Sequence, residues 1–251
     1  MRFAILFVGA LLFLSGGQII AAESIPSYVS EAVNDRIRTA DKPADPRRHI
    51  AELAAFAQIK PGDTVVELVP GGGYFTRVFS RIVGPKGHVY ALWPKEYAAE
   101  GRSDIEALQV MGRMPEYNNV EVIIEPAAEF KSPKPIDVMF TSQNYHDYPD
   151  KFMGHADLVT FGKQVYAALK PGGVFIVIDH AAEAGSGLRD TEKLHRIDPA
   201  RTRELVEAAG FKFDGESDVL RNPADDHTKL VFDDSIRGHT DQFAYRFRKP
   251  R

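Results

Sequence analysis

The sequence predicts an α/β protein whose doubly wound, mostly parallel sheet has seven strands and an antiparallel C-terminal end. Beyond Asp45, short β-branched runs alternate with amphipathic stretches, which is typical of βαβ units covered by helices on both faces. A glycine turn follows the first of these runs, at the place where open α/β sheets bind ligands. Two strand-like segments, residues 211–219 and 242–247, predict the antiparallel end.

Local signals predict the elements in order. Asp45 and Pro46 predict a helix start, with an acidic cap and a proline in the first turn, and residues 60–63 end that helix. Its expected buried face carries Ile50, Leu53, Ala54 and Ala57. The expected strands cover residues 65–69, 88–93, 120–124, 136–140, 174–178, 211–219 and 242–247, and the later helices cover residues 74–82, 105–111, 152–169 and 198–210. We expect one domain over residues 46–251, preceded by an N-terminal extension at residues 23–45.

The first 22 residues have the layout of a secretory signal peptide. Arg2 precedes an apolar stretch at residues 3–14, and small residues stand before Glu23. The apolar stretch is shorter than the ~20 residues that span a bilayer. We therefore expect residues 1–22 to be cleaved and the mature chain to be exported to the periplasm without a membrane span. An uncleaved anchor is the alternative.

Composition excludes several classes of function. With 31 Lys and Arg against 35 Asp and Glu, the net charge of −4 gives no field that attracts nucleic acid. The absence of cysteine removes disulfides, thiolate metal sites and cysteine nucleophiles. A Gly-x-Ser-x-Gly elbow is also missing, so a serine hydrolase would lack its nucleophile. We expect a small molecule as the partner.

The turn at residues 70–73 suits a nucleotide-like ligand. Its sequence, Pro-Gly-Gly-Gly, lies between the first strand and the next helix, so bare backbone amides meet a helix N-terminus. A purely structural turn is the alternative.

Two motifs resemble those of a known family. Residues 65–76, VVELVPGGGYFT, resemble the first motif of class I S-adenosylmethionine-dependent methyltransferases, and residues 169–173, LKPGG, resemble the turn before their fifth strand. The similarity covers residues 46–250 and is closest to exported proteins predicted to be methyltransferases with no known acceptor. It implies S-adenosylmethionine as cofactor and methyl transfer to a small-molecule acceptor.

The resemblance also implies roles for individual residues. The acidic residue at Glu67 would orient the amino-acid part of the cofactor, and Gly71 and Gly73 would let the cofactor lie against the backbone. The acceptor would lie near residues 71–74, which include Tyr74, and near residues 142–147.

Three departures change the expected nucleoside contacts. Valine stands at Val69 where the family has glycine, and because valine does not easily adopt positive φ, we expect the turn to begin later. The second strand ends in Trp93 in place of an acid, and Glu125 comes one residue before the usual adenine-reading position. We expect Trp93 to stack on adenine and Glu125 or Glu96 to supply the polar contact. A Trp93 that only covers the sheet edge is the alternative.

A polar cluster follows the fourth strand. Asn144, Tyr145, His146 and Asp147 lie where the acceptor would meet the cofactor, so we expect Asn144 to contact the cofactor and His146 with Asp147 to form an acid/base pair. Tyr145 is expected to shape an aromatic acceptor pocket together with Tyr74. The alternative is a capped turn with His146 packed against it and the tyrosines in the core.

A metal site is not predicted. Carboxylates and imidazoles occur at residues 179–180, at His195 and at residues 225–227, but the chain has no His-x-x-x-His pair.

Two other functions compete with methyl transfer. An exported binding protein could keep the crevice without catalysis, and a nicotinamide-dependent oxidoreductase is disfavoured because the loop has Thr76 at the place of a third spaced glycine.

Overall fold

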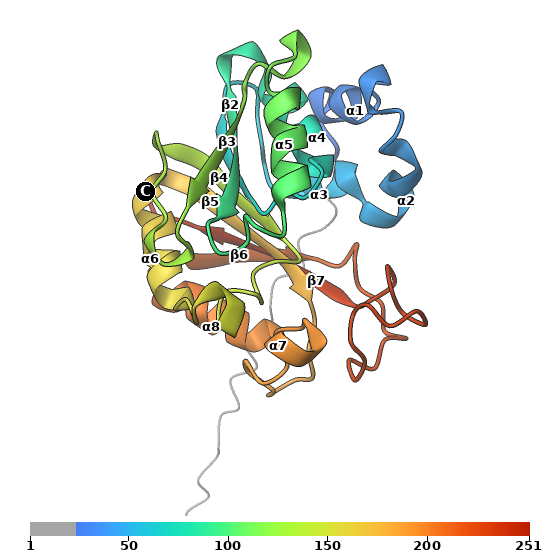
Figure 1. Ribbon diagram of the computed structural model, residues 1–251, viewed down its shortest axis with the longest axis vertical. Helices are drawn as coiled ribbons and strands as arrows, with labels where there is room; N and C mark the ends of the chain where they lie inside the picture. The colour runs from blue at the N-terminus through green and yellow to red at the C-terminus, as the bar shows by residue number, and fades with distance from the viewer. Residues whose placement is uncertain (1–23) are drawn as a thin grey trace, which may run out of the picture.

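The computed structural model describes residues 24–251 (Figure 1). The predicted signal peptide at residues 1–22 lies outside these residues. Within the described part of the chain, no helix is long and apolar enough to cross a membrane.

A single sheet of seven strands organises the molecule and confirms the predicted fold class. The strands are β1 (Thr64–Leu68), β2 (His88–Pro94), β3 (Val120–Glu125), β4 (Ile136–Ser142), β5 (Leu169–His180), β6 (Lys212–Ser217) and β7 (Gln242–Arg248). Their order is β3-β2-β1-β4-β5-β7-β6. The first five strands pair in parallel, and β7 pairs antiparallel with both β5 and β6.

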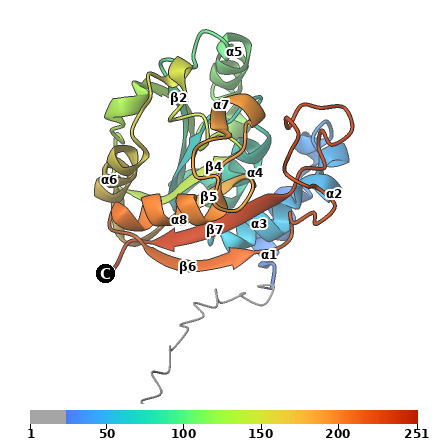
Figure 2. The same ribbon diagram turned by 90° about the horizontal axis from the view of Figure 1, so that it is seen from below.

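Helices cover both faces of the sheet (Figures 1 and 2). They are α1 (Ser27–Val33), α2 (Asp45–Arg48), α3 (Ile50–Phe56), α4 (Tyr74–Val83), α5 (Arg102–Met111), α6 (Leu158–Ala168), α7 (Thr191–Leu194) and α8 (Pro199–Ala208). α1 packs against α3 and α4, whereas α6 packs against α8. Because both faces are covered, the central strands are apolar on both sides, and Val65, Val66 and Leu68 of β1 are all buried.

The helix predicted from Asp45 is interrupted. His49 adopts a left-handed conformation with φ 46° and separates α2 from α3. Asp45 does not cap the helix, because its carboxylate accepts hydrogen bonds from Arg38 (2.9 Å) and from the Tyr74 hydroxyl (2.5 Å). The predicted apolar face is nevertheless buried, with Ile50 and Leu53 each 1% exposed.

Two other predicted boundaries are wrong. The helix expected over residues 152–169 starts at Leu158, because Gly154 takes a left-handed conformation and the Asp157 carboxylate accepts the Thr160 amide hydrogen bond as an N-cap. The turn expected at residues 169–173 lies inside β5, where Gly172 has φ 82° and the register with β4 shifts.

Part of the segment expected as an N-terminal extension packs on the domain. Val29 and Ala32 of α1 belong to the main hydrophobic core. Further along, the Asp41 carboxylate pairs with Arg77 of α4 at 2.6 Å, and Arg38 is 1% exposed. These contacts attach residues 27–45 to the helix that follows the glycine turn.

A buried ion pair fixes the loop between α7 and α8. Arg196 is 0% exposed and donates hydrogen bonds to the Ala181 carbonyl, to the Lys229 carbonyl and to the Asp225 carboxylate at 3.1 Å. Asp225 also accepts the Asp241 amide hydrogen bond, so the pair joins three loops.

We expect Asp225→Asn to lower the free energy of unfolding by about 3–5 kcal/mol, because it leaves the buried Arg196 charge without its partner. Urea unfolding followed by circular dichroism measures the change. Asp226→Asn is the control, since Asp226 is exposed and hydrogen-bonds within its own turn to Thr228. Equal stability of the two variants would contradict the structural role of the pair.

Candidate functional site

The carboxyl ends of β1, β4 and β5 surround a cavity of about 720 Å³, which we call the main cavity. Its volume lies in the range of small-molecule sites. The glycine turn after β1, the segment leading into α5, the loop after β4 and His180 and His195 form its walls.

The turn after β1 begins one residue earlier than predicted. Val69 adopts φ 46°, so the expectation that valine would avoid a left-handed conformation is wrong. This conformation costs a side-chain-bearing residue about 1–2 kcal/mol. Two contacts hold it, because the Val69 amide donates to the Leu92 carbonyl at 2.8 Å and its carbonyl accepts from the Asn144 side chain at 3.3 Å.

The two glycines of the motif have different surroundings. Gly71 has φ 54°, and a Cβ atom placed there would find open space. Gly73 has φ 81°, and a Cβ atom there would lie 2.7 Å from Leu108 of α5. Gly71 therefore provides bare backbone at the cavity wall, whereas Gly73 permits close packing of α5.

Glu67 lies below the turn and does not line the main cavity. Its side chain is buried and accepts a hydrogen bond from the Thr76 hydroxyl at 2.6 Å. Burial raises the pKa of Glu67 to about 8, although Thr76 and Arg48 act in the opposite direction. In this arrangement the carboxyl group stabilises the start of α4 through Thr76.

Arg48 and Tyr74 form one side of the cavity. The Arg48 guanidinium lies 4.3 Å from the centre of the Tyr74 ring and 4.9 Å from that of Phe75. Within residues 24–251, Arg48 has no hydrogen bond or ion pair, and burial lowers its pKa. Arg48 is therefore a cation that stacks on aromatic rings and keeps its hydrogen-bond donors free.

The expected nucleoside contacts are only partly present. Trp93 lines the cavity at 1% exposure, its Nε1 has no partner among the described residues, and a Cβ on Gly101 would lie 2.2 Å from its ring. Glu125 and Glu96 do not line the cavity, and Glu96 instead accepts the Ala127 amide hydrogen bond at 2.9 Å. The expectation for these two glutamates is therefore wrong for this structure.

Acidic side chains reach the cavity from α5 and the residues before it. Glu100 and Asp104 line it, and an Asp104 oxygen would lie 3.7 Å from a Cβ atom on Gly72. Neither residue lies at the end of a strand. The strand-end pattern that predicted a nucleoside contact for Glu125 therefore did not indicate them.

The loop after β4 separates its side chains. Asn144, His146 and Asp147 line the cavity, whereas Tyr145 is 0% exposed and packs against Phe175 in the core. Tyr145 is therefore not part of an acceptor pocket.

His146 lies at the centre of a charged cluster. Its Nδ1 lies 2.7 Å from the Asp179 carboxylate, and its Nε2 lies 3.2 Å from Asp147 and 3.3 Å from the Nδ1 of His195. Burial disfavours the charged ring, but Asp179 and Asp147 outweigh it and raise the pKa of His146 to about 10. In the chain without a metal ion, the two carboxylates therefore favour the protonated ring of His146.

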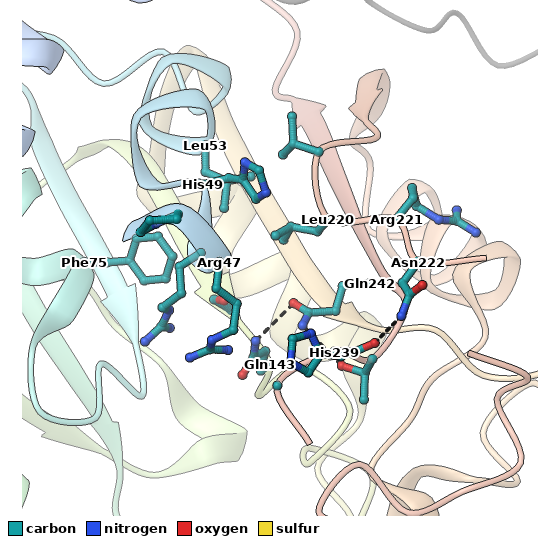
Figure 3. Close-up of a pocket in the computed structure, with 16 residues that line it drawn as sticks. Arg47, His49, Leu53, Phe75, Gln143, Leu220, Arg221, Asn222, His239 and Gln242 are labelled. Carbon is teal, nitrogen blue, oxygen red and sulfur yellow. Dashed lines mark hydrogen bonds between the residues drawn. The ribbon is translucent and has the colours of Figure 1, made fainter. Parts of the chain in front are cut away.

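A second cavity of about 510 Å³, the side cavity, adjoins the first and shares Arg48, Ser142 and Gln143 with it. Arg47, His49 and His239 are among the side chains around it (Figure 3). The Gln143 amide donates to Gln242 at 3.0 Å across its floor. No acidic residue lines it among residues 24–251, so its surroundings are cationic.

Glu67 should make stability depend on pH. Because its pKa is about 8 in the folded state and near 4.5 when unfolded, the folded state holds an extra proton between these values, and stability falls as pH rises through them. Glu67→Gln removes this dependence and keeps an acceptor for Thr76. We expect its unfolding free energy relative to wild type to increase by about 3–5 kcal/mol from pH 4.5 to pH 8, as measured by urea titration. A constant difference across this range would contradict the buried neutral carboxyl.

Comparisons with known proteins agree with this architecture. No family model matches the chain. A protein-L-isoaspartate O-methyltransferase of Ignicoccus hospitalis is 36% identical over 76 residues, which cover 30% of this chain and 33% of that protein. A ubiquinone/menaquinone biosynthesis C-methyltransferase of Vibrio vulnificus is 28% identical over 188 residues, which cover 73% of this chain and 60% of the relative. The chain thus spans about a third to three fifths of the length of these curated relatives.

A solved structure of similar fold is a SAM dependent methyltransferase from Aquifex aeolicus. It superposes with a TM-score of 0.59 at 17% identity and covers 85% of this chain and 97% of its own. At such low identity the solved structure shows similarity of fold alone. The curated relatives show similarity in sequence. The chain therefore has the fold of this methyltransferase and is similar in sequence to the two curated methyltransferases.

Proposed function

We propose that this protein transfers a methyl group from S-adenosylmethionine to a small anionic acceptor. The observation that carries the proposal is the bare backbone at Gly71, which borders an open cavity at the carboxyl end of β1. The methyltransferase relatives support the choice of cofactor.

The residues of the main cavity fit such a cofactor. A Cβ atom at Gly71 would project into space that a ligand could fill, and the buried Nε1 of Trp93 is a donor without a partner in the described chain. Glu100 and Asp104 offer acceptors for hydroxyl or ammonium groups at the same cavity. When bound, S-adenosylmethionine supplies the sulfonium methyl group.

The side cavity suits the acceptor. Arg47 and Arg48 have no hydrogen bonds or ion pairs within residues 24–251, and no carboxylate competes for them at the cavity wall. Guanidinium groups bind carboxylates and phosphates through paired hydrogen bonds. A small molecule with such a group would therefore be held beside the main cavity.

His146 and Asp147 contribute to the transfer by position and charge. Methyl transfer requires mainly an in-line approach of acceptor and donor, which rigid walls provide. Asp179 holds His146 through both its ring and its backbone amide, at 2.7 and 2.8 Å. Because the Nε2 of His146 faces Asp147 and His195, these side chains would act on the bound ligands through their charge and fixed position.

A second function is favoured by one observation. The acid that normally follows the second strand is replaced by Trp93, and Glu125 does not reach the cavity. A binding protein that holds the nucleoside without transferring methyl groups would tolerate both changes.

Gly71→Val should abolish binding of S-adenosylmethionine and of its demethylated product. The added side chain would occupy the open space at the cavity wall, in a backbone conformation that β-branched residues avoid. Isothermal titration calorimetry measures the affinity. Gly62→Val is the matched control, because Gly62 also has a positive φ and open space but lies before β1, at the opposite end of that strand.

We expect the control to bind like wild type. A wild-type chain that binds neither ligand at millimolar concentration would refute the proposed cofactor. Binding of both ligands without turnover on any acceptor would support the binding protein in place of the enzyme.

The acceptor is tested with pairs of compounds that differ only in a carboxylate or the matching carboxamide. Using donor with a labelled methyl group, we expect label in the carboxylates alone. Arg47→Gln should raise the KM of the carboxylate acceptors about tenfold, because one charged hydrogen bond is lost. The affinity for S-adenosylmethionine should not change. Arg113→Gln, an exposed arginine outside both cavities, is the control. Equal labelling of the carboxamides would contradict an anionic acceptor.

A further inference from the structure

Three side chains from distant parts of the chain meet at the edge of the main cavity. His146 and Asp147 follow β4, and His195 follows α7. The Nε2 of His146 lies 3.2 Å from an Asp147 oxygen and 3.3 Å from the Nδ1 of His195, and the last two atoms are 3.7 Å apart. We call these residues the His-Asp-His cluster.

These separations match a shared metal ion. Ligand atoms about 2.0–2.2 Å from a tetrahedral Zn²⁺ lie about 3.3–3.6 Å from one another. The three atoms of the cluster therefore need only small movements to coordinate one ion. All three residues line the main cavity, so a fourth position would face the space that a ligand enters.

The surroundings of His146 orient it as a metal ligand. Asp179 is 0% exposed and accepts from the His146 Nδ1 at 2.7 Å, which directs the Nε2 toward Asp147 and His195. A carboxylate behind a histidine in this way fixes the ring and raises its basicity as a ligand. The backbone amide of His146 donates to the other Asp179 oxygen, so the main chain is fixed as well.

The position of His195 is also determined. It adopts a left-handed conformation with φ 53°, and its ring lies 5.0 Å from that of Phe232. The next residue is Arg196, which the buried pair with Asp225 holds in place. Strained backbone of this kind is concentrated at binding and catalytic sites.

We propose that the His-Asp-His cluster binds one divalent transition-metal ion through His146 Nε2, His195 Nδ1 and the Asp147 carboxylate. Two imidazoles and one carboxylate are the protein ligands of many catalytic zinc and non-haem iron sites, which leave further positions open. The open position faces the main cavity and accepts an oxygen atom of water or of a bound small molecule. This site goes beyond the proposed methyl transfer, which does not require it.

Zinc titration of the chelator-treated chain, prepared without a polyhistidine tag, tests the proposal. We expect calorimetry to show one Zn²⁺ per chain, and Co²⁺ to give visible absorption bands of a low-symmetry site. His195→Asn and Asp147→Asn should each weaken Zn²⁺ binding at least 100-fold. Asparagine tolerates positive φ, so the variant at position 195 keeps its backbone.

His155→Asn is the matched control. His155 also has φ 53° but is exposed and lies outside the cluster, so the affinity for Zn²⁺ should not change. Asp179→Asn tests the positioning role and should weaken binding 10- to 100-fold with unchanged stoichiometry.

Two results would overturn the proposal. One is the absence of Zn²⁺ and Co²⁺ binding at 100 μM, which would leave the cluster as a protonated ion pair. The other is equal affinity of wild type and His195→Asn, which would place the metal at a surface site. Circular dichroism of each variant confirms that it is folded. The titrations contain no S-adenosylmethionine, so their outcome is independent of the proposed cofactor.

Discussion

Parallel pairing of the central strands is the constraint on which the site depends. β4 lies between β1 and β5, with Glu67 beside Phe140 and Phe140 beside Ile176, so the loops after all three strands emerge at one edge. Helices on both faces make these strands mostly apolar and leave that edge as the main place for polar groups. The glycine turn, the loop at Asn144 and the carboxylate of Asp179 are thereby brought together over more than 100 residues of sequence.

The backbone at this edge is held in uncommon conformations. Val69, Gln143 and His195 all have positive φ and all line the main cavity. Each conformation costs free energy that other contacts must offset. The Gln143 amide, for example, donates to the Ile178 carbonyl at 2.8 Å, as the Val69 amide does to Leu92. Hydrogen bonds to neighbouring strands thus stabilise the strained backbone at Val69 and Gln143. This backbone determines which side chains face the main cavity.

The strands were predictable from sequence because their apolar runs and turn residues are local signals. The side chains of the site were less predictable. Tyr145 and His146 are neighbours, yet one enters the core and the other the cavity, because the left-handed Gln143 redirects the loop after β4. Tertiary packing brings His195 and Arg48 to the main cavity from distant segments. No short sequence motif indicates this position. The prediction for Glu125 was wrong because it used only the residue's position at the end of a strand. The direction of the side chain could not be read from the sequence.

Arg48 belongs to the walls of both cavities. A guanidinium that bends toward an anion in the side cavity must alter its stacking on Tyr74 at the boundary of the main cavity. Under the proposed function, Arg48 would therefore couple the binding of the two ligands. If both cavities bind ligands as proposed, an anion in the side cavity would change the affinity of the main cavity by the same factor as the reverse.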